Sequence, residues 1–211
     1  MFDKITINAH SSIRLAGEMT VYVDPFKIEA ETHDADVICV THSHFDHFSI
    51  EDIRKIANED TVYVAPETMR EEMEKVQLTN CVFMNPYDSI AVDSVKIDAV
   101  PSYNTNKPMH PKENGWLGYI VEIEDTRIYI AGDTDIIEEG KTYECDIAMV
   151  PCGGTYTMDA SEAAEYVNMI SPKVAIPTHY GSLTGSAESG LEFKEKVNKD
   201  IEVRILIHPE A

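Results

Sequence analysis

The fold is decided by the stretch Asp36-Val-Ile-Cys-Val-Thr-His-Ser-His-Phe-Asp-His47, where an apolar run ends abruptly in histidine-rich sequence. Its first half predicts a buried β-strand that leads into a loop. In extended backbone, residues i and i+2 point the same way, so His42 and His44 can reach one ion. Asp46 and His47 follow in the turn and can reach a second position beside it. Such crowding of imidazoles and a carboxylate is costly without a cation or many hydrogen bonds, so the stretch predicts a metal site.

Two later stretches repeat the pattern of a strand followed by a polar loop. Asp133, in Ala131-Gly-Asp-Thr134, follows the alternating run 128–131, and Pro177-Thr-His-Tyr-Gly-Ser182 follows the apolar run 174–176. Gly-Asp-Thr is common in turns, and a single strand-end histidine is ambiguous. Beside the histidine-rich stretch, however, Asp133 and His179 are favoured as further ligands.

The remaining pattern predicts many short strands and four helices. Helices are expected over 49–59 with Ser49 as the N-cap, 66–76 with Pro66 in the first turn, 160–170 and 191–199. Asp159 and Glu162 form a capping box before the third of these. Residues 124–126, Glu-Asp-Thr, are expected to turn a β-hairpin, and 201–209 to form a last strand. A series of strands followed by alternating strands and helices occurs twice along the chain. This order favours two packed sheets with helices outside them, in one domain over 1–211. A doubly wound α/β sheet is the alternative.

Composition limits the partners and the compartment. The chain has 211 residues, 43% of them hydrophobic and 26% charged, which is typical of a folded globular domain. A net charge of −21 with no basic patch disfavours nucleic acid and anionic membrane surfaces as partners. The sequence shows no signal-peptide pattern and no apolar stretch long enough to span a bilayer, so we expect no membrane insertion. Four scattered cysteines without a C-x-x-C pair predict reduced thiols and a cytoplasmic location. An oligomer is compatible with these features.

The stretch 42–47 resembles the H-x-H-x-D-H signature of the metallo-β-lactamase superfamily. Asp133 in AGDT and His179 in PTHYGS resemble the bridging-aspartate and last-ligand motifs of that superfamily, in the same order along the chain. The resemblance implies an α/β (α+β) fold, the four-layer αββα sandwich of two mixed sheets flanked by helices. Asp24-Pro-Phe26 together with PTHYG is similar to the branch that contains ascorbate-6-phosphate lactonase.

The resemblance also implies a ligand set. His42 and His44 would bind a first metal, Asp46, His47 and His179 a second, and Asp133 would bridge the two. Relatives usually place one more first-metal histidine after a proline, where this chain has Asn104. We expect His110, further along the loop, to fill that place; Asn104 or water is the alternative. Imidazole and carboxylate ligands without thiolate suit two divalent cations, with Zn²⁺ expected and Mn²⁺ or Fe²⁺ as alternatives.

The other histidines carry weaker predictions. His33 and His208 are expected at the surface. His10, in a turn between two early strands, is expected to be an ordinary turn histidine, with a place beside the metals as the alternative.

The function expected from these residues is metal-dependent hydrolysis of a small-molecule ester, lactone or phosphodiester. A metal-bound hydroxide would attack, and Asp46 would orient it or accept its proton. Three alternatives use the same ligands: an RNase Z-like nuclease, a redox enzyme with one or two irons, such as a flavodiiron oxygen reductase or a persulfide dioxygenase, and a non-catalytic metal-binding module. The acidic composition argues against the nuclease, and His44 stands where the flavodiiron signature has glutamate.

Overall fold

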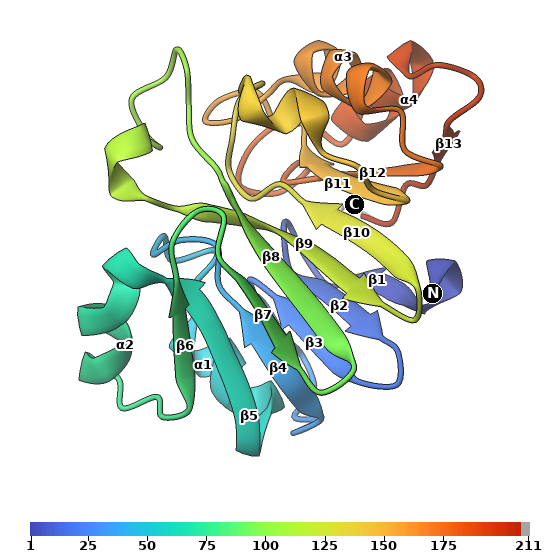
Figure 1. Ribbon diagram of the computed structural model, residues 1–211. Coiled ribbons are helices and arrows are strands. Elements are labelled where there is room, and N and C mark those ends of the chain that lie inside the picture. Colours follow the sequence, from blue (N-terminus) through green and yellow to red (C-terminus); the bar gives the residue numbers. More distant parts are fainter. Residues whose placement is uncertain (208–211) are drawn as a thin grey trace.

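Two mixed β-sheets lie face to face at the centre of the computed structural model, which describes residues 1–207 (Figure 1). The first sheet has the order β1 (Ile5–Ile7), β2 (Ile13–Ala16), β3 (Thr20–Val23), β4 (Ala35–Cys39), β5 (Ala57–Pro66) and β6 (Cys81–Met84). The second has the order β13 (Glu202–Val203), β12 (Val174–Thr178), β11 (Ile147–Pro151), β10 (Thr126–Ile130), β9 (Leu117–Ile123), β8 (Val95–Pro101) and β7 (Ser89–Val92).

Helices cover both outer faces. On the first sheet lie α1 (Ile50–Ile56) and α2 (Arg70–Lys75), and on the second lie α3 (Ala160–Ile170) and α4 (Ser189–Lys196) (Figure 1). Short 3₁₀ helices, at Phe2–Lys4, Glu67–Met69, Lys112–Asn114 and Glu139–Thr142, complete the elements of the described chain. The predicted αββα sandwich is thereby confirmed, and the doubly wound alternative is wrong.

Three apolar clusters hold the four layers together. The largest lies between the sheets, where alternate residues such as Leu15, Val37 and Tyr119 are fully buried. A second joins the outer face of the second sheet to α3 and α4, and a third joins the first sheet to α1 and α2. Successive side chains of a strand point to opposite faces of its sheet. One set therefore packs in the core between the sheets, and the other set packs under the helices.

Local sequence signals explain most element boundaries. Asp159 accepts the N–H groups of Ser161 and Glu162, and the Glu162 carboxylate accepts the Asp159 N–H, as the capping box predicts. Glu124 and Asp125 both have positive φ, at 49° and 55°, which is the geometry of a type I′ hairpin turn between β9 and β10.

Several boundaries differ from the sequence predictions. The last helix, α4, spans Ser189–Lys196 instead of 191–199, because Val197 is extended. Thr126 begins β10 instead of lying in the hairpin turn. α1 ends at Ile56, because Ala57 is extended and begins β5. Pro66 ends β5 and precedes the 3₁₀ turn, so it lies before the helix rather than within its first turn. The last strand is confined to Glu202–Val203 among the described residues, although the Arg204 N–H still donates to the Ala175 carbonyl. The predicted surface residue His208 lies outside the described residues.

The topology brings several strand ends to one edge of the sandwich. β8 and β9 are antiparallel, β9 and β10 are antiparallel, and β10, β11 and β12 are parallel, so β8, β10 and β12 end at the same edge. The loop after β4 is joined there by the hydrogen bond from the Leu117 N–H to the Thr41 carbonyl. Polar side chains that follow these strands therefore lie close together at this edge.

No helix within residues 1–207 has the length and apolar character needed to cross a membrane.

Candidate metal centre

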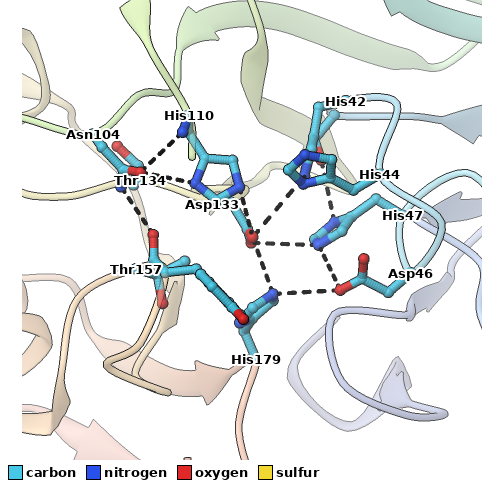
Figure 2. Close-up of polar contacts among 12 residues, drawn as sticks. His42, His44, Asp46, His47, Asn104, His110, Asp133, Thr134, Thr157 and His179 are labelled. Carbon is cyan, nitrogen blue, oxygen red and sulfur yellow. Dashed lines mark hydrogen bonds and ion pairs between the residues drawn. The ribbon is translucent and has the colours of Figure 1, made fainter. Parts of the chain in front are cut away.

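All seven predicted ligands meet at this edge (Figure 2). They come from four loops: the one after β4 supplies His42, His44, Asp46 and His47, and those after β8, β10 and β12 supply His110, Asp133 and His179. Six of the seven are buried, and His44 is half-buried.

Asp133 lies at the centre of the cluster. One of its carboxylate oxygens, Oδ2, is 3.0 Å from Nε2 of His179, 3.2 Å from Nε2 of His110 and 4.0 Å from Nε2 of His42. The other, Oδ1, is 3.4 Å from Nε2 of His47. The carboxylate thus faces histidines of both predicted metal positions, as a bridging ligand must.

Asp46 faces the second position only. Its Oδ2 is 3.4 Å from Nε2 of His47 and 3.6 Å from Nε2 of His179. At the first position, Nε2 of His42 lies 3.0 Å from Nδ1 of His44. Two groups of ligand atoms result, each compact enough for one ion: His42, His44 and His110, and His42, His47 and Asp133.

The Asp24 carboxylate sets the ring orientation of two of these histidines. Oδ2 of Asp24 is 2.7 Å from Nδ1 of His47, so this nitrogen must carry a proton and donate. The Thr41 hydroxyl donates to the same oxygen, and its own oxygen lies 2.9 Å from Nδ1 of His42. Because the single Thr41 proton goes to Asp24, His42 donates from Nδ1. Both rings therefore turn Nε2 toward the centre, and this is the nitrogen that binds a metal ion once it carries no proton.

His110 and His179 are held in the same way. Oδ1 of Asn104 is 2.9 Å from Nδ1 of His110 and also accepts the His110 backbone N–H. The Thr184 hydroxyl donates to the His179 carbonyl, and its oxygen lies 3.3 Å from Nδ1 of His179. Asn104 is therefore turned toward His110, and of these two residues His110 is the one whose ring nitrogen, Nε2, faces Asp133.

The donor set fits divalent cations. The Nε2 atoms of His10, His47, His110 and His179 and Oδ1 of Asp133 are buried and have no hydrogen-bond partner among the described residues. Buried polar atoms are rarely left without partners, and here five of them face one another. Imidazole nitrogen and carboxylate oxygen in this arrangement are the ligands that Zn²⁺ and related ions take.

The electrostatic field of the cluster favours positive charge. Burial opposes the ionised form of Asp133, yet His179 and His47 hold the pKa of its carboxyl well below the usual range. Burial also opposes the charged form of His47, but Asp133 and Asp24 raise the pKa of its ring well above the usual value. Burial lowers the pKa of His42, with His47 acting in the same direction. Protons and metal ions are attracted by the same carboxylates, so the field that holds a proton on His47 also attracts a cation.

His10 was expected to be an ordinary turn histidine, and that expectation is wrong. It is 1% exposed, its ring centroid is 3.7 Å from that of His179, and its Nε2 is 3.2 Å from Oδ2 of Asp46. Its Nδ1 faces the Ser182 hydroxyl at 3.4 Å, so the ring is oriented like those of the ligands. His10, Asp46 and His179 form a third group of atoms close enough for one ion. His33, by contrast, is exposed, as predicted.

A cavity of about 370 Å³ opens onto the cluster. The cavity is lined by five of the predicted metal ligands: His44, Asp46, His110, Asp133 and His179. A small molecule in the cavity can therefore reach side chains of both predicted metal positions. Its size is within the range of small-molecule sites. Cys152 and Tyr180, which follow β11 and β12, are buried in the apolar cluster beneath α3 and α4.

Comparison with known proteins agrees with this geometry. The family model of a β-lactamase superfamily domain matches residues 4–179. The UPF0173 metal-dependent hydrolase of Thermoplasma acidophilum is 33% identical over 85% of this chain and 84% of its own. That of Pyrococcus furiosus is 30% identical over 96% of each chain. A crystal structure from Parabacteroides distasonis, described as a candidate metal-dependent hydrolase, has a TM-score of 0.80 at 33% identity and covers 97% of this chain and 93% of its own. The chain therefore belongs to the metallo-β-lactamase superfamily and is, like these relatives, a metal-dependent hydrolase.

Proposed function

We propose that the chain binds two divalent cations, with zinc as the expected ion, and hydrolyses an ester or lactone bond. The first cation would be held by His42, His44 and His110, the second by Asp46, His47 and His179, and both by Asp133. Bound ions would supply Lewis acidity and an activated water at neutral pH. The observation that carries the proposal is the convergence of unpartnered, buried Nε2 atoms on the two carboxylates.

The residues of the chain have distinct tasks in this reaction. Oδ2 of Asp46 faces the second position and accepts a proton from the attacking water. The water oxygen bonds to the acyl carbon, and the bond between that carbon and the ester oxygen breaks. The proton held by Asp46 passes to the departing oxygen, so that a carboxylic acid and an alcohol leave and Asp46 is again ionised. His42, His47, His110 and His179 keep fixed ring orientations throughout, because each Nδ1 is held by a hydrogen bond from outside the centre.

The site favours an enzyme over a non-catalytic metal-binding module, because the ligand groups lie on the wall of a cavity that a small molecule can enter. A redox enzyme with iron is the second candidate, since the same ligands accept Fe²⁺. An RNase Z-like activity is disfavoured by the net charge of −21. The metal content and the absorption spectrum of the purified protein separate zinc from iron, and a precursor-tRNA cleavage assay tests the nuclease.

The decisive experiment compares metal content and turnover in matched variants. Protein loaded with zinc and dialysed is measured by atomic emission and assayed with 4-nitrophenyl acetate and bis(4-nitrophenyl) phosphate. We expect about two ions per chain and ester hydrolysis in the wild type, and the loss of both in Asp133→Ala and His42→Ala. His33→Asn, at an exposed histidine, is the control and should keep both. Full turnover in a metal-depleted Asp133→Ala protein would refute the proposal.

Bound metal should also stabilise the fold, because the native state alone assembles the ligands. A ligand at one hundred times its Kd adds about 2.7 kcal/mol to the free energy of unfolding. We therefore expect chelation to lower the Tm of the wild type and to leave that of Asp133→Ala almost unchanged.

Other expectations from the sequence stay predictions. One domain over 1–211 is supported by the central core that both sheets share. A cytoplasmic location and the oligomeric state are testable by cell fractionation and light scattering. A place near ascorbate-6-phosphate lactonase is testable with that phosphorylated lactone, whose anionic group has no lysine or arginine to meet among the described residues that line the cavity.

A further inference from the structure

The cavity above the metal centre has an apolar rim. Seven large hydrophobic side chains are exposed in residues 1–207, and four of them line this one cavity: Phe45, Met109, Tyr156 and Leu183. Exposed apolar side chains scattered singly need no explanation, but their concentration around one cavity marks a binding site.

Each rim residue is tied to the residues that hold the cluster. Phe45 lies between His44 and Asp46, and Met109 directly precedes His110. Leu183 directly precedes Thr184, which faces Nδ1 of His179.

Tyr156 is tied to the cluster through its carbonyl, which accepts a hydrogen bond from the amide of Asn104, the residue that orients His110. The rim therefore has a fixed position relative to the ions and is continuous with the reaction site.

Positive charge is missing from the cavity wall. No lysine or arginine is among the described residues that line it. The two lysines of the loop after β8 are occupied elsewhere: Nζ of Lys107 lies 2.6 Å from Asp135, and Nζ of Lys112 lies 2.7 Å from Glu139. An anionic substituent at the rim would meet apolar surface and a strongly acidic protein, whereas an uncharged apolar group is buried favourably.

We propose that the substrates are uncharged esters whose acyl group is apolar and lies against Phe45, Met109, Tyr156 and Leu183. This inference rests on the proposed hydrolysis and adds its substrate class. The ester carbonyl is placed toward Asp46 and Asp133, and the acyl chain extends outward along the rim. The enzyme then prefers substrates whose acyl chain is long enough to be buried against the rim and carries no charge.

Two series of chromogenic esters test the substrate class on the metal-loaded protein. The first extends the acyl chain from 4-nitrophenyl acetate to butyrate and hexanoate. A fully buried methylene is worth about fourfold in kcat/KM, so we expect a rise of between twofold and fourfold for each added methylene. The second compares 4-nitrophenyl butyrate with the mono-4-nitrophenyl ester of succinic acid, in which a carboxylate replaces the terminal methyl. We expect at least a tenfold preference for the butyrate.

Rim variants have matched controls elsewhere on the surface. Met109 and Met169 are 44% and 41% exposed, and Leu183 and Leu191 are 45% and 57% exposed, but only the first of each pair lines the cavity. Met109→Ser and Leu183→Ser should lower kcat/KM for the hexanoate about fivefold, with a smaller loss for the acetate. Met169→Ser and Leu191→Ser should change neither.

A binding readout separates this inference from the proposed reaction. N-phenyl-1-naphthylamine, an uncharged apolar dye, should fluoresce with the wild type and bind several-fold more weakly to Met109→Ser and Leu183→Ser. If no ester is hydrolysed but the dye shows this pattern, the reaction is wrong and the apolar site stands. If esters are hydrolysed without preference for chain length or charge, the substrate class is wrong. It is equally wrong if the rim variants only convert a dimer to a monomer, because the rim is then a contact between copies of the chain.

Discussion

Nδ1 of His47 lies 2.7 Å from Oδ2 of Asp24, a residue 23 positions earlier in the chain. The same carboxylate accepts the hydroxyl and the backbone N–H of Thr41, and the Thr41 hydroxyl in turn faces His42. One buried carboxylate therefore fixes the ring orientation of one histidine at each predicted metal position.

Replacing Asp24 with asparagine should weaken metal binding without unfolding the protein. Asp24 has a φ of 49°, and asparagine tolerates this left-handed conformation well. The amide is a weaker acceptor and stabilises the metal-bound ring less than the carboxylate does. Loss of such an outer partner typically costs about ten- to one-hundredfold in metal affinity. Competition against a fluorescent zinc chelator measures the change.

Asp52→Asn is the matched control for this variant. Asp52 is also buried and accepts the backbone N–H groups of Lys27 and Ile28, so its loss should lower stability. It holds no histidine of the cluster, and zinc affinity should stay within about twofold of the wild type. Equal zinc affinity in Asp24→Asn and Asp52→Asn would contradict the role given to Asp24.

The sequence was informative where one short stretch carried the signal. The spacing of His42, His44, Asp46 and His47 after an apolar run was enough to predict a metal site at a strand end, and the structure places these residues together. Asp133 and His179 could also be predicted as ligands, because each comes shortly after a strand. Parallel strands bring such positions to one edge of the sheet.

Residues without a local signal were missed or left open. Asp24 and His10 lie in turns of the first sheet, and nothing within a few positions of either shows that it reaches the cluster. The choice between His110 and Asn104 depended on the path of a long loop, which local sequence does not determine. The last strand was predicted to be longer than it is. The apolar run 205–207 continues the sequence pattern of a strand but does not pair in the sheet.

His110 and Asn104 should behave as one unit. Asn104 reaches the centre only through His110, whose Nδ1 and backbone N–H it binds. Asn104→Ala should therefore weaken the first metal position, and His110→Ala should weaken it more. The double variant should be no worse than His110→Ala, because the two effects are not additive when one residue acts through the other. Titration with Co²⁺, followed by visible absorption, measures each position. Additive losses would show that Asn104 contacts the metal independently.

Gly153 should matter for metal binding although it contributes no side chain. A Cβ at this position would overlap the His179 carbonyl oxygen and Oγ1 of Thr184, which together hold the His179 loop. Gly153→Ala should therefore displace His179 and weaken the second position by about tenfold or more. Gly140→Ala is the control. Its Cβ would overlap the Tyr166 hydroxyl, which donates to Tyr129 and to none of the predicted ligands, so this variant should lower Tm without loss of zinc affinity. The prediction is wrong if both variants lose stability but bind zinc equally well.

His10 should contribute to the second metal position through Asp46. Its Nε2 lies 3.2 Å from Oδ2 of Asp46, its ring packs on that of His179, and its carbonyl accepts the His179 N–H. Its φ of 55° makes asparagine the best substitution, since asparagine keeps the backbone conformation and is too short to reach Asp46. In His10→Asn, Asp46 and His179 lose a packed neighbour, so the second equivalent of Co²⁺ should bind about tenfold or more weakly while the first is retained.

The control for His10→Asn is His33→Asn. His33 is a histidine with φ of 47°, the same left-handed conformation, but it is exposed and lies against the Ala57 carbonyl. Both variants change the same side chain in the same backbone conformation, so any effect of the substitution itself cancels. If the two proteins bind both Co²⁺ equivalents with equal affinity, His10 is a buried neighbour of the centre and not part of what holds it. If only His10→Asn loses the second equivalent, the centre extends to the turn between β1 and β2, and Asp46 depends on a residue 36 positions earlier in the chain.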